Sequence, residues 1–209
     1  MATEVREMTV AVGETLQRLR EEQGLSLRTL AARSGFSPSF LSQVENGQTS
    51  PSIASLARLA QCLGLGLAAF FDEAGGGDGS LRRSAVVVRS GSRRNLASEW
   101  SRARMEPLVH QGVLHHLEGL VVSLAPGGRS GKQPGAEPLE QLALVLEGEL
   151  QLTLGGEEHH LAPGDAAAIP AGVPHRWSNA GGRAAKIVLV RGRSAPSGGS
   201  RPEGDGSPH

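Results

Sequence analysis

The first third of the chain places its apolar residues at the spacing of helices. Leu27, Leu30 and Ala31 recur at positions i, i+3 and i+4 and so form one helical face. Gly35 stands where this face ends, and a residue without a Cβ adopts a positive φ there at no steric cost. Ser37 can then N-cap a following helix through its hydroxyl. The pattern predicts two short helices joined by a tight turn, over residues 27–46.

The same periodicity predicts three more helices around this pair. We expect a first helix from about Val12 to Gln23, preceded by frayed residues at 1–10. A fourth helix begins after Ser50-Pro51, and a short fifth helix covers residues 67–71. Together they predict a compact five-helix bundle. Its central pair is a helix-turn-helix, and the second helix of such a pair is the element that enters the DNA major groove.

Beyond residue 80 the apolar residues form short aliphatic runs bounded by Gly, Pro or Asn, which is typical of strands. Gly155-Gly156, between Leu154 and Glu157, indicates a tight hairpin. The expected strands lie at 86–88, 120–124, 142–146, 150–154 and 187–190. The pattern therefore predicts an all-β second domain.

Composition suggests where the domains end. The segment AGGGDGS at 74–80 has the make-up of a flexible linker, and the last 18 residues are of low complexity and predicted to be disordered. The expected organisation is a DNA-binding domain at 1–72 with its core at 12–72, a linker at 73–80, basic connecting strands at 81–104, an all-β domain at 105–191 and a tail at 192–209.

Charge is unevenly distributed along a chain whose formal net charge is zero. Residues 1–72 hold six Arg and seven acidic residues, whereas residues 81–104 hold seven Arg and one acidic residue. A DNA-binding domain without a basic excess depends on where its few arginines lie. The arginines in question are Arg18, Arg20, Arg28 and Arg33. The 81–104 segment could add phosphate contacts, but a solvated edge strand is the favoured interpretation.

Several classes of protein are disfavoured by the sequence. It has no apolar run near 18 residues and no basic region followed by an apolar core, so we expect neither a membrane span nor a signal peptide. The single cysteine, Cys62, has no partner and fits a reducing compartment. We expect a cytoplasmic protein.

Residues 12–72 resemble the lambda-repressor-like (Cro/XRE) DNA-binding domain. The resemblance rests on the spacing from Ala31 through Gly35 to Leu41, on Val44-Glu45-Asn46-Gly47 and on Ser50-Pro51. It implies a double-stranded DNA operator as partner. The DNA-facing residues that it implies are Ser37, Pro38, Ser39, Ser42, Gln43 and Asn46. Ser26 and Arg28, as candidate phosphate contacts, complete the predicted DNA-binding set.

Gln43 is the best base reader of this set, because an amide can pair bidentately with adenine. Ser26 and Asn46 are better placed for phosphates. The family often has Gln at the position of Leu27, and leucine cannot make that phosphate contact.

The second half of the chain resembles the cupin family over about residues 105–191. The segment PGDAAAIPAGVPHRWSN at 163–179 matches the second cupin signature, and residues 146–150 match the end of the first. The resemblance implies a jelly-roll barrel. In metal-binding cupins the two signatures supply three His and one Glu, whereas the corresponding positions here are Gly135, Glu137, Gln141 and His175.

Because two histidines are missing, we expect no cofactor, and a divalent metal site is the less favoured alternative. Glu137, Gln141 and His175 remain weak candidate ligands, and His115 or His116 could complete a site only if a strand turned one of them inward. The residues expected near a small molecule at the barrel mouth are Arg129, Glu137, Gln141, His175 and Trp177. For His175 and Trp177 a packing role in the core is an open alternative.

Regulators that pair these two domains form a known bacterial group, and their barrels commonly dimerise. The resemblance therefore implies a sequence-specific transcriptional regulator, which we expect to be a repressor, a homodimer and not an enzyme, with a cupin domain that senses a small-molecule effector. The alternatives are a cupin-type metal-dependent enzyme with an accessory DNA-binding domain, and a protein-interaction module with an empty barrel.

Overall fold

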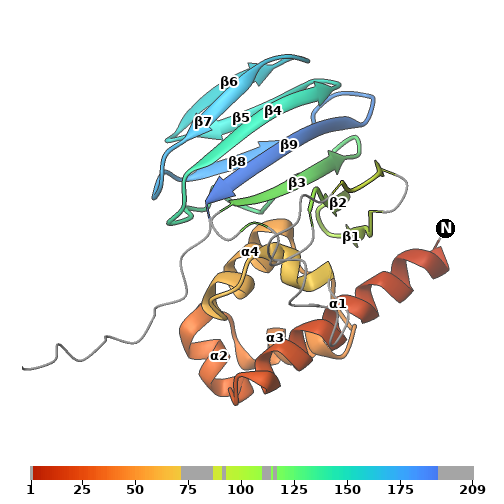
Figure 1. The fold of residues 1–209 in the computed structure, drawn as a ribbon, viewed down its shortest axis with the longest axis vertical. Coiled ribbons are helices and arrows are strands. Elements are labelled where there is room, and N and C mark those ends of the chain that lie inside the picture. Colours follow the sequence, from red (N-terminus) through yellow and green to blue (C-terminus); the bar gives the residue numbers. More distant parts are fainter. Residues whose placement is uncertain (1, 72–86, 91–92, 110–113, 115–116, 193–209) are drawn as a thin grey trace, which may run out of the picture.

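The computed structural model describes residues 2–71, 87–90, 93–109, 114 and 117–192, with side chains from Val12 onward. The predicted linker at 73–80, the tail beyond Gly192, and His115 and His116 lie outside the described residues. Within them the chain forms a helical part and a β part, which lie against each other (Figure 1).

The helical part has four α-helices followed by a short 3-10 helix. Their bounds are α1 Ala2–Glu22, α2 Leu27–Ser34, α3 Pro38–Glu45, α4 Ile53–Cys62 and η1 Leu67–Phe71. The prediction of five α-helices was therefore wrong in its last member, because five residues are too few to nucleate an α-helix and the tighter 3-10 turn forms instead. The prediction for the first helix was also too short, since the helical backbone begins at Ala2 rather than near Val12.

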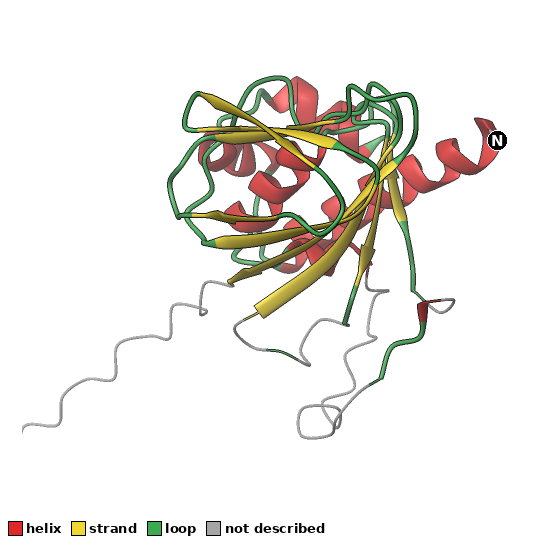
Figure 2. Cartoon of the chain, turned by 90° about the horizontal axis from the view of Figure 1, so that it is seen from above, coloured by secondary structure: helices red, strands yellow, loops and turns green. Residues whose placement is uncertain are grey.

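The β part consists of two antiparallel sheets, which form two layers (Figure 2). The first has the strand order β1-β2-β3-β9-β4-β7 and the second the order β6-β5-β8. The bounds are β1 Leu96–Ser98, β2 Ala103–Pro107, β3 Leu117–Leu124, β4 Gln141–Glu147, β5 Leu150–Leu154, β6 Glu157–Leu161, β7 Ala166–Ile169, β8 His175–Ser178 and β9 Ala185–Gly192.

Most of the expected strands are present, and the two-residue hairpin at Gly155-Gly156 is confirmed by the pairing of Leu154 with Glu157. The strand expected at 86–88 is not: Val87 and Val88 have irregular backbone, and residue 86 lies outside the described residues. Val87 is 75% exposed and so has no apolar layer to pack against. Aliphatic composition alone does not make a strand without such a layer.

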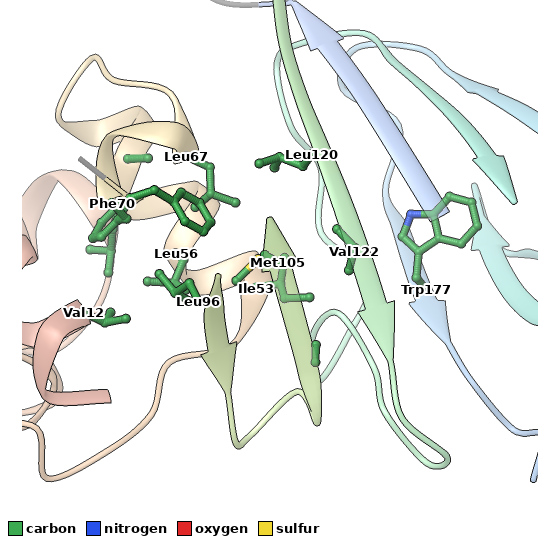
Figure 3. Packing of buried hydrophobic residues seen from close by; sticks show 14 of the residues in the cluster. Val12, Ile53, Leu56, Leu67, Phe70, Leu96, Met105, Leu120, Val122 and Trp177 are labelled. Atoms are coloured by element: carbon green, nitrogen blue, oxygen red, sulfur yellow. The ribbon is translucent and has the colours of Figure 1, made fainter. Parts of the chain in front are cut away.

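One apolar core runs through both parts of the molecule. Figure 3 shows Ile53, Leu56 and Leu67 from the helices facing Met105 and Leu120 from the strands. This continuity means that the helical part is docked on the β part by shared burial as well as by the connecting chain.

Hydrogen bonds fix the docking at the start of α4. The Ser98 hydroxyl donates to the Pro51 carbonyl at 2.7 Å, and the Ser101 hydroxyl accepts from the Ile53 amide at 3.1 Å. The Ala54 amide donates to the Ser130 carbonyl at 3.0 Å. Backbone amides in the first turn of a helix have no hydrogen-bond acceptor within that helix. Here the β part supplies acceptors for two of these amides. None of the helices in the described ranges is both long enough and apolar enough for a membrane span.

Candidate DNA interface and interdomain cavity

Side-chain caps and one glycine shape the helix-turn-helix. The Ser26 hydroxyl accepts from the Thr29 amide and caps α2, and the Ser37 hydroxyl accepts from the Phe40 amide and caps α3, both at 3.1 Å. Gly35 between them has φ +69°, the left-handed conformation expected of it. The turn therefore forms from local sequence, as predicted.

The position of α3 depends on two contacts with α1 that the sequence patterns did not suggest. Gly13 packs so closely that a Cβ there would lie 2.3 Å from the Val44 carbonyl oxygen. Arg20 and Glu45 form a buried bidentate pair, with Nε–Oε1 at 2.7 Å and Nη2–Oε2 at 2.9 Å. The hydrogen bonds with Glu45 raise the pKa of Arg20 above its ordinary value. Arg20 is therefore occupied in holding α3, not placed to contact phosphate.

Of the eight residues in the predicted DNA-binding set, seven are exposed and Ser42 is half-buried. Gln43 points outward from α3, while its neighbours Val44 and Glu45 are buried. The Asn46 amide donates to the Ser42 carbonyl at 2.8 Å and so helps to end α3. Arg28 is exposed, whereas Arg18 pairs with Glu22 at 2.8 Å. The structure thus gathers the predicted set around one exposed helix, supported from behind by α1.

A cavity of about 1110 Å³ lies between α4 and the inner face of the β part. Its walls come from both domains. The lining residues of the helical part include Phe36, Phe40, Ile53, Arg58 and Leu67, and the β part contributes side chains from β3, β4, β8 and β9 together with the loop at 130–138. A volume of this size accommodates a small organic molecule. The contribution of the DNA-binding domain to the wall was not predicted, because it depends on how the two domains dock.

Four of the five residues predicted to lie near a small molecule do line this cavity: Glu137, Gln141, His175 and Trp177. Arg129 does not. It is exposed, and its guanidinium lies 5.3 Å from the centre of the Trp100 ring. Trp100, which the sequence patterns did not single out, is itself part of the wall.

His175 is held in one tautomer by its neighbours. Its Nδ1 lies 3.1 Å from the Val173 carbonyl, which can only accept, so the proton sits on Nδ1. In the neutral ring Nε2 is then an acceptor, and the Gln141 amide lies 3.3 Å from it. The two residues form a buried pair at the cavity wall.

A second polar cluster surrounds Arg191, at the end of β9. Its Nε donates to Glu118 at 2.6 Å and its Nη1 to Glu137 at 3.0 Å. Glu118 also accepts a hydrogen bond from the backbone amide of Ala68, in η1 of the helical part. Arg191 and Glu118 are thus a direct connection between the cavity wall and the DNA-binding domain. In the sequence, these two residues can be recognised only as charged residues at strand positions whose neighbours in the same phase are apolar.

The donors present do not fit the cupin metal site. Within the described residues, no group of three or more His, Cys, Asp or Glu side chains is placed to hold a metal ion. The cupin positions carry one imidazole, His175, whose Nε2 faces an amide, and one carboxylate, Glu137, which is paired with Arg191. One imidazole and one engaged carboxylate are a poor set for a transition metal.

Comparisons with known proteins agree with this architecture. A helix-turn-helix family model matches residues 16–70, and a cupin domain model matches residues 120–191. The HTH-type transcriptional regulator PuuR of Escherichia coli is 32% identical over 86% of this chain and 93% of its own length. The chain belongs to the cupin-containing helix-turn-helix transcriptional regulators. It is a DNA-binding regulator of that family.

Two further relatives of this regulator extend over most of its length. The transcriptional regulator SutR of Escherichia coli is 26% identical over 80% of the chain and 86% of its own length. A crystal structure of an HTH_3 family transcriptional regulator from Vibrio cholerae superposes with a TM-score of 0.68 at 23% identity. It covers 90% of this chain and 98% of its own, so the two-domain fold is shared.

Proposed function

We propose that this regulator changes its affinity for an operator when a small molecule occupies the interdomain cavity. The observation that carries the proposal is that both domains build the wall of one cavity. A ligand there touches α4 and the barrel at once, so its binding depends on how the two are docked. By linkage, a ligand that favours one docking arrangement shifts the population of that arrangement.

Side chains at the cavity wall are in direct contact with residues of the recognition helix α3. Arg58 on α4 lines the cavity, and its guanidinium lies 5.4 Å from the centre of the Phe36 ring. Phe36 packs on Phe40 of α3, with ring centres 5.0 Å apart, and both of these rings also line the cavity. Arg191 and Glu118 provide the second route, through the Ala68 amide. These contacts support a coupled effector site.

We further propose that the regulator is a repressor that acts as a homodimer in the cytoplasm without a bound metal or other cofactor. The outer face of the six-stranded sheet supports the dimer. Leu142, Leu144 and Leu146 of β4 are 52%, 39% and 42% exposed on that face. Contiguous exposed leucines on a sheet favour an interface. Elemental analysis of the purified protein checks the absence of metal, and a stoichiometric transition metal would contradict it.

The test of effector sensing begins with the operator, selected from random duplex DNA and mapped by footprinting. Metabolite fractions are then screened for those that shift the affinity in fluorescence anisotropy. His175→Ala should retain basal operator affinity and show a reduced shift, because His175 is at the cavity wall. His159→Ala, on the exposed strand β6, is the matched control. An undiminished shift in the His175 variant would place the effector elsewhere.

A further inference from the structure

The cavity wall contains a hydrogen-bond donor with nothing to donate to. Trp177 is 3% exposed, and its indole Nε1 is buried without a partner in the described part of the chain. The residue lines the cavity, and Figure 3 shows it beyond Val122 of β3. A buried N–H without an acceptor is costly, typically by about 1–3 kcal/mol. Because the nitrogen itself is closed off from the cavity, no ligand atom reaches it without movement of the wall, and the ligand class is inferred from the other groups there.

The charged residues at the wall indicate which class of ligand the cavity suits. The described charged residues that line the cavity are Arg58, Lys132, Arg191 and Glu137, so cations outnumber anions. The one carboxylate, Glu137, already accepts from Arg191, and Glu118 behind it accepts from Arg191 and from Ala68. The acceptors of the cluster are therefore engaged. The excess of cations at the wall favours an anionic ligand over a cationic one.

The two carboxylates on Arg191 differ in how firmly they are held. The Glu118 side chain is 3% exposed and lies opposite Arg191 in the pairing of β3 with β9. The Glu137 side chain is 24% exposed, lies on a loop and makes the longer contact of the two. Arginine recognises carboxylates through a planar fork of donors. A ligand carboxylate can take the place of Glu137 while the Glu118 contact stays intact.

We propose that the cavity binds a small organic carboxylate with an apolar body. The carboxylate replaces Glu137 on Arg191, and the apolar body contacts Leu120, Val122 and Ile187. This assignment rests on the proposed function, because it names the chemical class of the same effector. Arg191 also donates to Glu118, and Glu118 accepts from the Ala68 amide of the helical part. Replacement of Glu137 by the ligand therefore changes a partner of Arg191, which itself contacts the residue that holds Ala68.

The test uses the full-length protein and a matched panel of compounds. Straight and branched carboxylates of about four to eight carbons, sized for the cavity, are compared with amides and amines that have the same carbon skeletons. Binding is measured by titration calorimetry and by the rise in melting temperature. We expect at least one carboxylate to bind, and to bind more tightly than its amide and amine counterparts.

One variant and its control test the exchange of carboxylates without removing Arg191. Glu137→Gln removes the competing carboxylate and should tighten carboxylate binding several-fold, whereas it would weaken the binding of an amine. Glu157→Gln, at an exposed carboxylate of β6, is the matched control and should leave carboxylate binding unchanged.

Two results would overturn the assignment. One is that no carboxylate of the panel binds, and the other is that amines bind in preference and lose affinity in Glu137→Gln. An amine that binds and also shifts operator affinity would leave the proposed function in place and refute only the ligand class. A carboxylate that binds as expected without any effect on operator affinity would support the ligand class and refute the regulatory role.

Discussion

At the scale of single residues, the helix-turn-helix divides its polar side chains between reading DNA and holding the reader in place. Gln43 is exposed on α3, whereas the adjacent Val44 and Glu45 are buried. A charged residue in the core is tolerated only when paired, and Glu45 receives both of its hydrogen bonds from Arg20. The outward and inward faces of one short helix thus have separate roles.

Gln43→Ala should weaken binding to the selected operator by about 1–3 kcal/mol, because it removes an amide that can pair with a base edge. Binding to non-specific DNA should stay unchanged, since phosphate contacts do not involve this side chain. Anisotropy titrations on operator and scrambled duplexes measure both. Gln17→Ala, at an exposed position of α1 outside the predicted DNA-facing set, is the control. Equal losses of affinity on both duplexes would mean that Gln43 contacts the DNA phosphate backbone and not a base.

Arg20→Met should destabilise the DNA-binding domain by about 3–5 kcal/mol, because it leaves the Glu45 carboxylate buried without a counter-charge. Arg20→Met combined with Glu45→Met should recover much of that loss, since neither charge then remains. Urea unfolding followed by circular dichroism measures the difference. If the double variant were as unstable as the sum of the two single variants, the pair would not be the source of the effect.

At the scale of elements, periodicity and capping residues predicted the turns and helices that depend on neighbouring residues. They did not predict the ion pairs between residues that are far apart in the sequence. The turn between α2 and α3 follows from Ser37 and Gly35 with their immediate neighbours, and it formed as expected. The pair of Arg20 with Glu45 joins residues 25 positions apart, and that of Glu118 with Arg191 joins residues 73 apart. Such pairs depend on tertiary packing, which one sequence does not reveal.

The signal that could have found these pairs is the phase of a charge within an apolar pattern. Arg20 follows Leu16 by four residues, on the same helical face, and both are buried. Arg191 shares the inward phase of β9 with Ala185 and Ile187. A charge in an inward phase requires a partner. The sequence could therefore have indicated that a buried partner exists, but not which residue it is.

Gly13→Ala tests how closely α1 approaches α3. In an exposed helix this change stabilises by about 1 kcal/mol, because alanine is the better helix former. Here the added Cβ would lie 2.3 Å from the Val44 carbonyl and 2.6 Å from the Glu45 carbonyl, so the helices must separate. We expect a net loss of about 1–3 kcal/mol in unfolding free energy. Gln17→Ala is the control, and a stabilised Gly13 variant would show that the helices pack more loosely.

At the scale of the whole molecule, the surfaces that remain exposed are those that neither domain uses for the shared core or the cavity. One side of α4 and the inner faces of the sheets are committed to the shared core and the cavity. The recognition helix and the outer face of the six-stranded sheet are left on the surface. One of these surfaces is suited to DNA and the other to a second copy of the chain. A dimer made through the sheets would present two recognition helices to a two-fold symmetric operator.

Leu144→Glu should break the proposed dimer. In a two-fold interface the same leucine occurs on both copies, so one substitution places two like charges in the apolar contact. Its register partners, Ala166 on β7 and Val188 on β9, offer no counter-charge. Sedimentation equilibrium at micromolar concentration should give the dimer mass for the native chain and the monomer mass for the variant. Operator affinity should also fall in the variant.

Val87→Glu, at an exposed apolar residue outside the strands, is the control for added charge. A dimer mass for the Leu144 variant would move the interface to another surface, and a monomeric native chain would refute the homodimer.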